Sequence, residues 1–352
     1  MRSHQEANFV PLSPLSFIKR TAQIFGDHTA IIYDEKKQTW RTLYQRCCAF
    51  ADAIQLRGLK RGDVVSVLAF NTPEMIELQF SVAMAGGVLN TINTRLDPES
   101  IAGIIDHAEP FSLIFDAELS EVVADALSRC NHQPTHIIVI QSPDFPVSDQ
   151  LRGGIDYDEV VQSGDPAARW SLPTSELDAF GLNYTSGTGG RPKGVVINHR
   201  GAYLMAMGTV PAWSVPMHPT YLYTVPLFHC NGWGHAWMNA LVAGTMICLK
   251  KIEASAIFDA ISRYRVTHFG GAPVVLSLQM HTDMGDERGI RLRCICLGDA
   301  ALRGSRMSAR GLCGKGSESR IARSSLSNAR SSVCATTRCL RINITIRQNG
   351  TT

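Results

Sequence analysis

The stretch YTSGTGGRPKG, residues 184–194, combines the groups that a phosphate-binding loop requires. Thr185, Ser186 and Thr188 supply hydroxyl donors, and Lys193 supplies a positive point charge. The four glycines let backbone N–H groups approach an anion closely and adopt dihedral angles that other residues avoid. Because glycine-rich turns also occur without ligands, composition alone leaves a plain turn and an anion site equally open.

The spacing of this stretch excludes two common phosphate loops. A Walker loop needs glycine before its lysine and a hydroxyl residue after it, whereas Pro192 precedes Lys193 and Gly194 follows it. A dinucleotide-binding fingerprint that begins at Gly187 would place Pro192 at its last glycine. Proline also disfavours a helix that continues directly from the loop, and the strand-like segments FGLNYTS and GVVIN flank it. We therefore expect a hairpin loop between two strands.

Strand and helix patterns alternate along the rest of the chain. Three predicted helices start with a capping residue followed by proline, at Ser13-Pro14, Thr72-Pro73 and Asp97-Pro98. Another predicted helix is capped by Thr42 and ends at Gly58. Predicted strands cover residues 29–34, 39–41, 64–70, 137–140, 180–186, 194–198, 221–227, 245–251 and 266–271. This order indicates an α/β fold in which a largely parallel sheet is covered by helices on both faces.

The predicted organisation has four parts. They are a first α/β subdomain (8–141), a connecting segment (142–176), a second α/β subdomain with the glycine loop (177–280) and an atypical tail (281–352). The tail has 13 lysine and arginine residues against 5 acidic ones, and it lacks aromatic residues and proline. Because the tail has few large apolar side chains whose burial would offset the entropy lost on ordering, we expect a disordered basic extension or a segment translated in another reading frame. Nucleic-acid binding is the alternative, but a run of basic residues alone does not identify a nucleic-acid-binding segment.

Composition gives no sign of a membrane span or a secretory route. The chain has 45% hydrophobic and 18% charged residues, a net charge of +3 and no apolar run long enough to cross a bilayer. Its start, MRSHQEANFVPL, lacks the basic and then apolar layout of a signal peptide. We expect a cytoplasmic protein with reduced cysteines and without a membrane or nucleic-acid partner.

Several separate blocks resemble the AMP-forming acyl-CoA synthetases, or adenylate-forming enzymes. YTSGTGGRPKGVV resembles their ATP loop. NFVPLSPLSF, VVSVLAFNTPEMIELQF, AGGVLNTINTRLD, INHRGAYL, VPLFHCNGW and VTHFGGAPVVL resemble plant acyl-activating enzymes near the benzoate–CoA and butyrate–CoA ligases. The resemblance covers residues 8–280 with the blocks in the family's order. It implies the N-terminal large domain of these enzymes, which contains two α/β subdomains.

The resemblance also implies a reaction. Such ligases join a short-chain or aromatic carboxylic acid to AMP, using ATP and Mg²⁺, and then transfer the acyl group to coenzyme A. Their first step depends on positioning and on electrostatic stabilisation of the phosphates. The residues implied to hold the phosphates are Thr185, Ser186, Gly187, Thr188, Gly189, Gly190 and Lys193, with Thr188 also at the metal. Gly189 replaces the second threonine of the family's loop, so one hydroxyl donor is lost.

A second block, PLFHCNGW, is implied to form the pocket for the acid and its adenylate. The implied pocket residues are His229, Asn231, Gly232 and Trp233, together with Gly271, Ala272 and Pro273 of a third block. Catalysis is implied for Lys193, Thr188 and His229. The alternatives are that His229 is a buried, hydrogen-bonded histidine, that Trp233 is a core residue, and that the third block is a strand-to-helix turn.

Past residue 280 the resemblance fades. The family's later Tyr-Gly-x-Thr-Glu and Thr-Gly-Asp blocks are absent, as is its mobile C-terminal domain with a catalytic lysine. We therefore expect a truncated form with little or no activity. The alternatives are a non-catalytic ATP- or acyl-binding module, or a regulator of a full-length partner. The last residues, Asn-Gly-Thr-Thr, lack the peroxisomal address of the family's plant members, which agrees with the expected cytoplasmic location.

Overall fold

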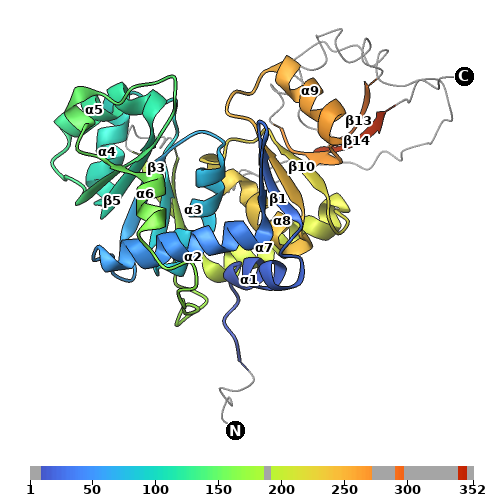
Figure 1. Cartoon of the computed structure of the whole chain (residues 1–352), viewed down its shortest axis with the longest axis horizontal. Coiled ribbons are helices and arrows are strands. Elements are labelled where there is room, and N and C mark those ends of the chain that lie inside the picture. Colours follow the sequence, from blue (N-terminus) through green and yellow to red (C-terminus); the bar gives the residue numbers. More distant parts are fainter. Residues whose placement is uncertain (1–8, 186–191, 272–289, 297–339, 347–352) are drawn as a thin grey trace, which may run out of the picture.

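The computed structural model of the 352-residue chain describes residues 9–185, 192–271, 290–296 and 340–346. Most of these residues form an α/β architecture with two mixed sheets that stand side by side (Figure 1). This confirms the predicted α/β class. The strands are divided between two sheets, so helices lie between the sheets as well as on their outer faces.

The larger sheet has seven strands and is parallel except at one edge. Across the sheet they are β7 (Ile155–Asp156), β6 (His136–Ile140), β5 (Ser112–Asp116), β3 (Val64–Leu68), β4 (Val88–Thr91), β8 (Ala179–Thr185) and β9 (Lys193–Asn198). β9 runs antiparallel to β8, which confirms the predicted hairpin. The sequences of β3 and β5, VVSVL and SLIFD, are mostly apolar because helices cover both of their faces.

The smaller sheet combines strands from the two ends of the described chain. Across the sheet they are β12 (His268–Phe269), β10 (Thr220–Tyr223), β11 (Thr245–Cys248), β1 (Thr29–Tyr33) and β2 (Lys36–Thr39), with β2 antiparallel to β1. Each sheet thus takes strands from both ranges predicted as subdomains, so neither sheet coincides with 8–141 or 177–280. The domain boundaries themselves stay a prediction.

Helices complete the layers on both sides of each sheet. They are α1 (Leu15–Ile24), α2 (Trp40–Leu56), α3 (Pro73–Met84), α4 (Pro98–Ala108), α5 (Ser120–Arg129), α6 (Tyr157–Gln162), α7 (His199–Trp213), α8 (His235–Val242) and α9 (Ala254–Tyr264). α1, α2, α3, α7 and α8 share one core with both sheets, whereas α4 and α5 cover the outer face of the larger sheet and α9 that of the smaller. Strand alternation separates these cores, since Ile114 enters the central one and Phe115 the outer one.

The start of α2 differs from the prediction of a strand at 39–41 and a cap at Thr42. Thr39 is the N-cap, and its side chain accepts a hydrogen bond from the Thr42 backbone N–H at 3.2 Å. Trp40 therefore begins the helix, where it is fully buried and donates its indole N–H to the carbonyl oxygen of Gly244 at 3.1 Å. The prediction for Asp97 is confirmed, because its side chain accepts from the Ser100 N–H at 2.9 Å.

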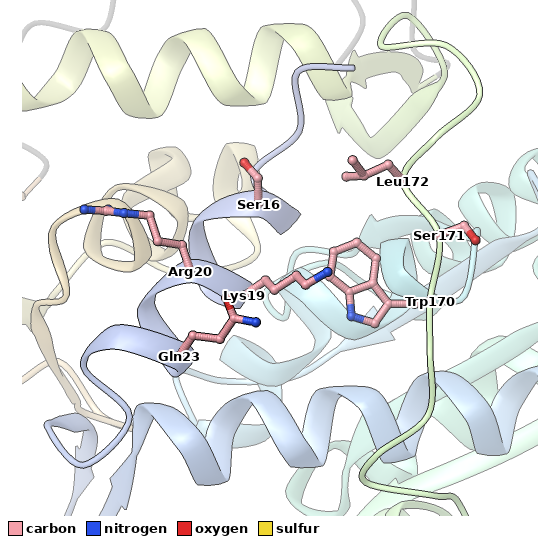
Figure 2. Close-up of a pocket in the computed structure, with 7 residues that line it drawn as sticks. All are labelled: Ser16, Lys19, Arg20, Gln23, Trp170, Ser171 and Leu172. Atoms are coloured by element: carbon pink, nitrogen blue, oxygen red, sulfur yellow. The ribbon is translucent and has the colours of Figure 1, made fainter. Parts of the chain in front are cut away.

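The segment predicted as an irregular connection, 142–176, is partly ordered into regular elements. It contributes the edge strand β7 and helix α6, which packs on α2. Its last part, 170–172, passes beside α1 (Figure 2). In the tail, the structure describes an antiparallel pair, β13 (Ile290–Cys296) and β14 (Leu340–Ile346), and the other tail residues lie outside the described ones. No helix in the described ranges is long and apolar enough to cross a membrane.

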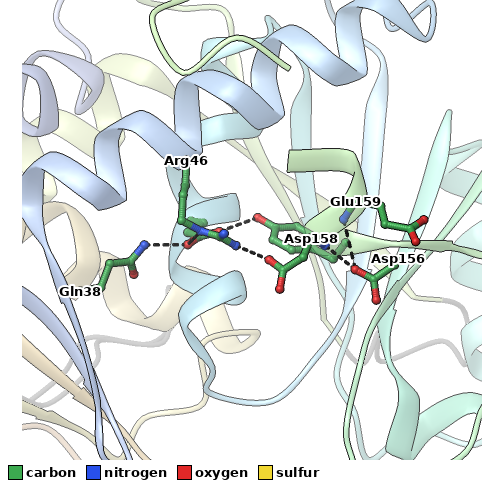
Figure 3. Close-up of polar contacts among 7 residues, drawn as sticks. Gln38, Arg46, Asp156, Asp158 and Glu159 are labelled. Atoms are coloured by element: carbon green, nitrogen blue, oxygen red, sulfur yellow. Dashed lines mark hydrogen bonds and ion pairs between the residues drawn. The ribbon is translucent and has the colours of Figure 1, made fainter. Parts of the chain in front are cut away.

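A buried carboxylate ties four elements together between the sheets. Glu77 of α3 is 1% exposed and accepts hydrogen bonds from Arg46 Nε at 2.6 Å, Gln38 Nε2 at 2.9 Å and Tyr157 Oη at 3.0 Å (Figure 3). Arg46 also donates to Asp158 Oδ1 at 2.7 Å. A charge this deeply buried is tolerated because a cation and neutral donors together satisfy it.

Removing the cation from this network should destabilise the fold. We expect Arg46→Ala to lower the free energy of unfolding by about 3 kcal/mol in urea denaturation, because Glu77 is left buried without its counter-charge. The control Arg129→Ala removes an ion pair whose side chains are 51% and 45% exposed. That control should cost less than about 1 kcal/mol. Equal losses in the two variants would contradict a stabilising role for the buried network.

Candidate functional site

The carboxyl ends of strands from both sheets meet at one edge, where Asn71 joins them. Asn71 follows β3 and is 5% exposed. Its Nδ2 donates to the carbonyl oxygens of Tyr223 (3.2 Å) and Val225 (3.0 Å), and its Oδ1 accepts from the Leu227 N–H at 2.7 Å. The chain after β10 is thereby attached to the end of β3. In α/β proteins, ligands bind outside the carboxyl ends of the strands, so this edge is the first place to look for a site.

The glycine loop opens at the same edge of the larger sheet. Thr185 ends β8 and lies directly opposite Lys193, the first residue of β9. Both residues are exposed. Ser186, Gly187, Thr188, Gly189 and Gly190 lie outside the described residues, so their predicted contacts with phosphate stay predictions. The mouth of the loop carries one hydroxyl and one cation that are accessible to an anion.

The segment η4 (His229–Gly234) follows β10 and forms a left-handed turn. Its residues from Cys230 to Gly234 all have positive φ, between 45° and 67°. The left-handed conformation costs about 1–2 kcal/mol per non-glycine residue, and Cys230, Asn231 and Trp233 are in it. Glycine is required at Gly232, because a Cβ there would lie 2.9 Å from Leu227 Cδ2. Backbone strain of this kind is concentrated at functional sites.

The turn directs an unsatisfied amide into the junction between the sheets. Asn231 is fully buried, and neither its Oδ1 nor its Nδ2 has a hydrogen-bond partner among the described residues. A Cβ at Gly181 of β8 would lie 3.1 Å from Asn231 Nδ2. Nearby, Asn183 Nδ2 donates to Thr91 Oγ1 at 2.7 Å, and its Oδ1 is also unpaired in the part of the chain that the structure describes. Such groups are costly unless a ligand or water satisfies them.

The other predicted pocket residues differ in exposure and in position. His229 is exposed, so the alternative of a buried histidine is wrong. Trp233 is half-buried, and its ring centroid lies 5.8 Å from that of His235. Gly271 follows β12 at the same edge as η4, since β12 is parallel to β10, and Thr224 Oγ1 donates to the adjacent carbonyl of Gly270. Ala272 and Pro273 lie outside the described residues.

Sequence reasoning missed His235, which lies under the turn. It is 2% exposed, and its Nδ1 is hydrogen-bonded to the Tyr221 hydroxyl. Burial lowers its pKa to about 3, so the ring is neutral at physiological pH. Asn71, Thr91 and Asn183 were also missed. The available signal was a polar residue at the end of an apolar strand run, as in VLAFN, GVLNT and FGLN.

Lys250 provides a second connection between the sheets. It follows β11 of the smaller sheet, and its Nζ lies 3.0 Å from Asp116 Oδ1 and 3.1 Å from Glu118 Oε2 of the larger one. Ser142 Oγ accepts a further hydrogen bond from Nζ at 3.0 Å. Burial raises the pKa of Asp116, and the hydrogen bond and charge of Lys250 oppose that rise. The two sheets are therefore connected at β5 as well as at the end of β3.

Residues 18–317 match the family model described as AMP-binding enzyme. The chain belongs to the AMP-binding enzyme family. This confirms the resemblance drawn from the sequence blocks. The match also extends beyond residue 280, where the resemblance fades to the eye, and so includes part of the basic tail.

The relatives of this AMP-binding family member include ligases that act on small acids. It is 40% identical to 2-methylpropanoate–CoA ligase of Humulus lupulus (77% of this chain, 50% of the relative) and 40% identical to the peroxisomal benzoate–CoA ligase of Arabidopsis thaliana (78% and 48%). It thus spans about half the length of these relatives. An anthranilate CoA ligase solved with anthranoyl-AMP shares its fold at a TM-score of 0.70 and 20% identity, over 78% of this chain and 52% of that one.

The neutral state of His235 predicts a pH dependence of stability. The unfolded chain binds a proton on this histidine below its ordinary pKa of 6.5, whereas the folded chain does not until about pH 3. The contribution of the neutral His235 to the free energy of unfolding is therefore fully present above pH 6.5, and it decreases as the pH is lowered toward 3. Between pH 7 and 4.5 we expect wild type to lose about 2 kcal/mol more unfolding free energy than His235→Asn, which keeps a polar atom near Tyr221.

Urea denaturation at several pH values measures this difference. Above pH 7 the difference in unfolding free energy between wild type and His235→Asn should not change with pH. This constant difference serves as the internal control. Parallel stability curves from pH 7 down to 4.5 would show that His235 does not resist protonation in the folded state.

Proposed function

We propose that this chain carries the nucleotide and acid sites of an AMP-forming acid–CoA ligase. The observation that supports this most is the position of two features along one strand, β8. The loop mouth, Thr185 and Lys193, opens at the carboxyl end of β8, and the unsatisfied Asn231 amide lies against Gly181 of the same strand. A cation for phosphates and an amide for a carboxylate or adenylate are thus presented by adjoining segments.

In the proposed reaction, an oxygen of the carboxylate attacks the α-phosphorus of ATP, and the bond to pyrophosphate breaks. The thiol of coenzyme A then attacks the acyl carbon and AMP leaves. We assign Thr185, Ser186, Gly187, Thr188, Gly189, Gly190 and Lys193 to the phosphates, and His229, Asn231, Gly232, Trp233, Gly271, Ala272 and Pro273 to the acid. The chain's contribution is to orient the two anions and to stabilise charge that develops on the phosphates.

Magnesium would reach this site with the ATP phosphates, because Mg²⁺ keeps several waters and uses few protein ligands. Among the described residues, no group of three or more acidic, histidine or cysteine side chains is placed to bind a metal by itself. Thr188 is the proposed protein ligand. The cation would supply charge neutralisation on the phosphate oxygens.

The proposed acid is short or aromatic. The half-buried Trp233 places its ring centroid 5.8 Å from that of His235, so a flat apolar side chain lies at the turn. The relatives' names carry 2-methylpropanoate and benzoate, which have that size and character. We also propose a cytoplasmic location without a nucleic-acid partner, although several relatives, the benzoate–CoA ligase among them, are named as peroxisomal.

A second candidate is binding without turnover. In this candidate the chain holds ATP or the acid and regulates a full-length partner. The two candidates make the same prediction for ligand binding and different predictions for chemistry.

Lys193→Ala should weaken ATP binding at least about tenfold in isothermal titration calorimetry, because it removes a charge-assisted contact with phosphate. The matched control is Lys60→Ala, since Lys60 is exposed and precedes β3 at the opposite edge of the sheet. ATP–pyrophosphate exchange with benzoate, butyrate and 2-methylpropanoate then separates the candidates. Exchange lost in Lys193→Ala supports the ligase, and binding without exchange supports the regulator. A wild-type chain that binds neither ATP nor any of the three acids would contradict both.

A further inference from the structure

Two adjoining surface cavities lie far from the proposed site. Their volumes are about 430 and 390 Å³, and both are lined by Trp170, Ser171 and Leu172. The first lies against α1, from which the Lys19 side chain reaches toward the Trp170 indole (Figure 2). The second reaches Ala179 and His199, which stand at the start of β8 and just beyond the end of β9. The cavities are therefore at the opposite edge of the larger sheet from the glycine loop, and we call them together the Trp170 trough.

The Trp170 trough is positively charged on a body of opposite sign. Residues 1–280 carry 21 lysine and arginine residues against 26 acidic ones. The trough nevertheless contains four cations, Lys19, Arg20, Arg61 and Arg169, and a single carboxylate, Asp178, which is already paired with Arg61. Such a local excess attracts anions. It also excludes the chain's own basic tail as the occupant.

An aromatic wall and an extended backbone run along the trough. Lys19 Nζ lies 5.5 Å from the centroid of the Trp170 ring, whose N–H donates to the Tyr44 hydroxyl at 3.0 Å. Residues 169–174 belong to no helix or strand, and their backbone groups make no hydrogen bond with the rest of the described chain. A free stretch of extended backbone is a template for pairing with another extended chain.

We propose that the Trp170 trough binds an extended acidic peptide segment of a partner protein. Backbone groups of the peptide pair with residues 169–172, and its carboxylates meet Lys19 in the first cavity and Arg169 in the second. Two cavities joined along one strand-like segment fit an elongated ligand, whereas a lipid headgroup or free phosphate would fill only one of them and leave the backbone donors unpaired. The site is independent of the proposed ligase reaction, because it lies at the other edge of the sheet.

The test uses the full chain and a fluorescein-labelled peptide of alternating glutamate and valine. Fluorescence anisotropy should show saturable binding that Lys19→Ala/Arg169→Ala weakens about tenfold, the sum of two modest charge contacts. The matched control is Lys36→Ala/Lys37→Ala, which removes two exposed cations of β2 outside the trough and should change the affinity less than about twofold. Added salt should weaken binding to the wild type.

Three results would overturn the proposal. The first is the absence of saturable binding. The second is an equal effect of the two double substitutions, which would place the peptide on the basic tail or another surface. The third is binding to anionic phospholipid vesicles without binding to the peptide. Retention of helix signal in circular dichroism shows that the variants fold, as expected from the exposure of all four side chains. ATP binding should be unchanged in both variants, so failure here is distinguishable from failure of the proposed function.

Discussion

The amide of Asn71 is the contact on which the arrangement of the site depends. One side chain satisfies two carbonyl oxygens and one N–H of the segment after β10, and it does so from the end of β3 in the other sheet. Since Asn71 is nearly fully buried, these three hydrogen bonds form in a low dielectric and fix the backbone strongly. The left-handed turn η4 starts two residues after Leu227, so its position relative to β8 follows from this contact.

The backbone of the η4 turn is strained, as is common at functional sites. Three non-glycine residues in the left-handed conformation, the unpaired amide of Asn231 and the unpaired amide oxygen of Asn183 represent a cost that the fold does not recover within the described residues. A ligand at the junction would satisfy Asn231 and Asn183, whereas the exposed Lys193 is free to attract its phosphates. Lys250 and its two carboxylates form a second connection between the sheets, next to the strand that Asn71 follows.

Capping and turn residues in the sequence predicted much of the local structure. They did not predict which strands, distant in the sequence, pair with each other. Pro192 after a glycine run correctly indicated a hairpin, and Asp97 before proline correctly indicated a helix start. The start of α2 was misplaced because Thr39 and Thr42 are both good caps three residues apart. The division into two sheets was not predictable, because β1 pairs with β11 more than two hundred residues away in the sequence. Asn71 escaped notice for the same reason, since its partners are backbone atoms 152 to 156 residues distant.

Asn71 positions the η4 turn against β8, the strand that leads into the glycine loop, and the turn and the loop thereby form one binding site. Calorimetric titration of ATP into Asn71→Leu tests it most directly, because leucine keeps the shape of the side chain and removes its three hydrogen bonds. We predict a folded protein by circular dichroism whose ATP affinity is reduced about tenfold or more. A folded Asn71→Leu variant with wild-type affinity for ATP would contradict the claim.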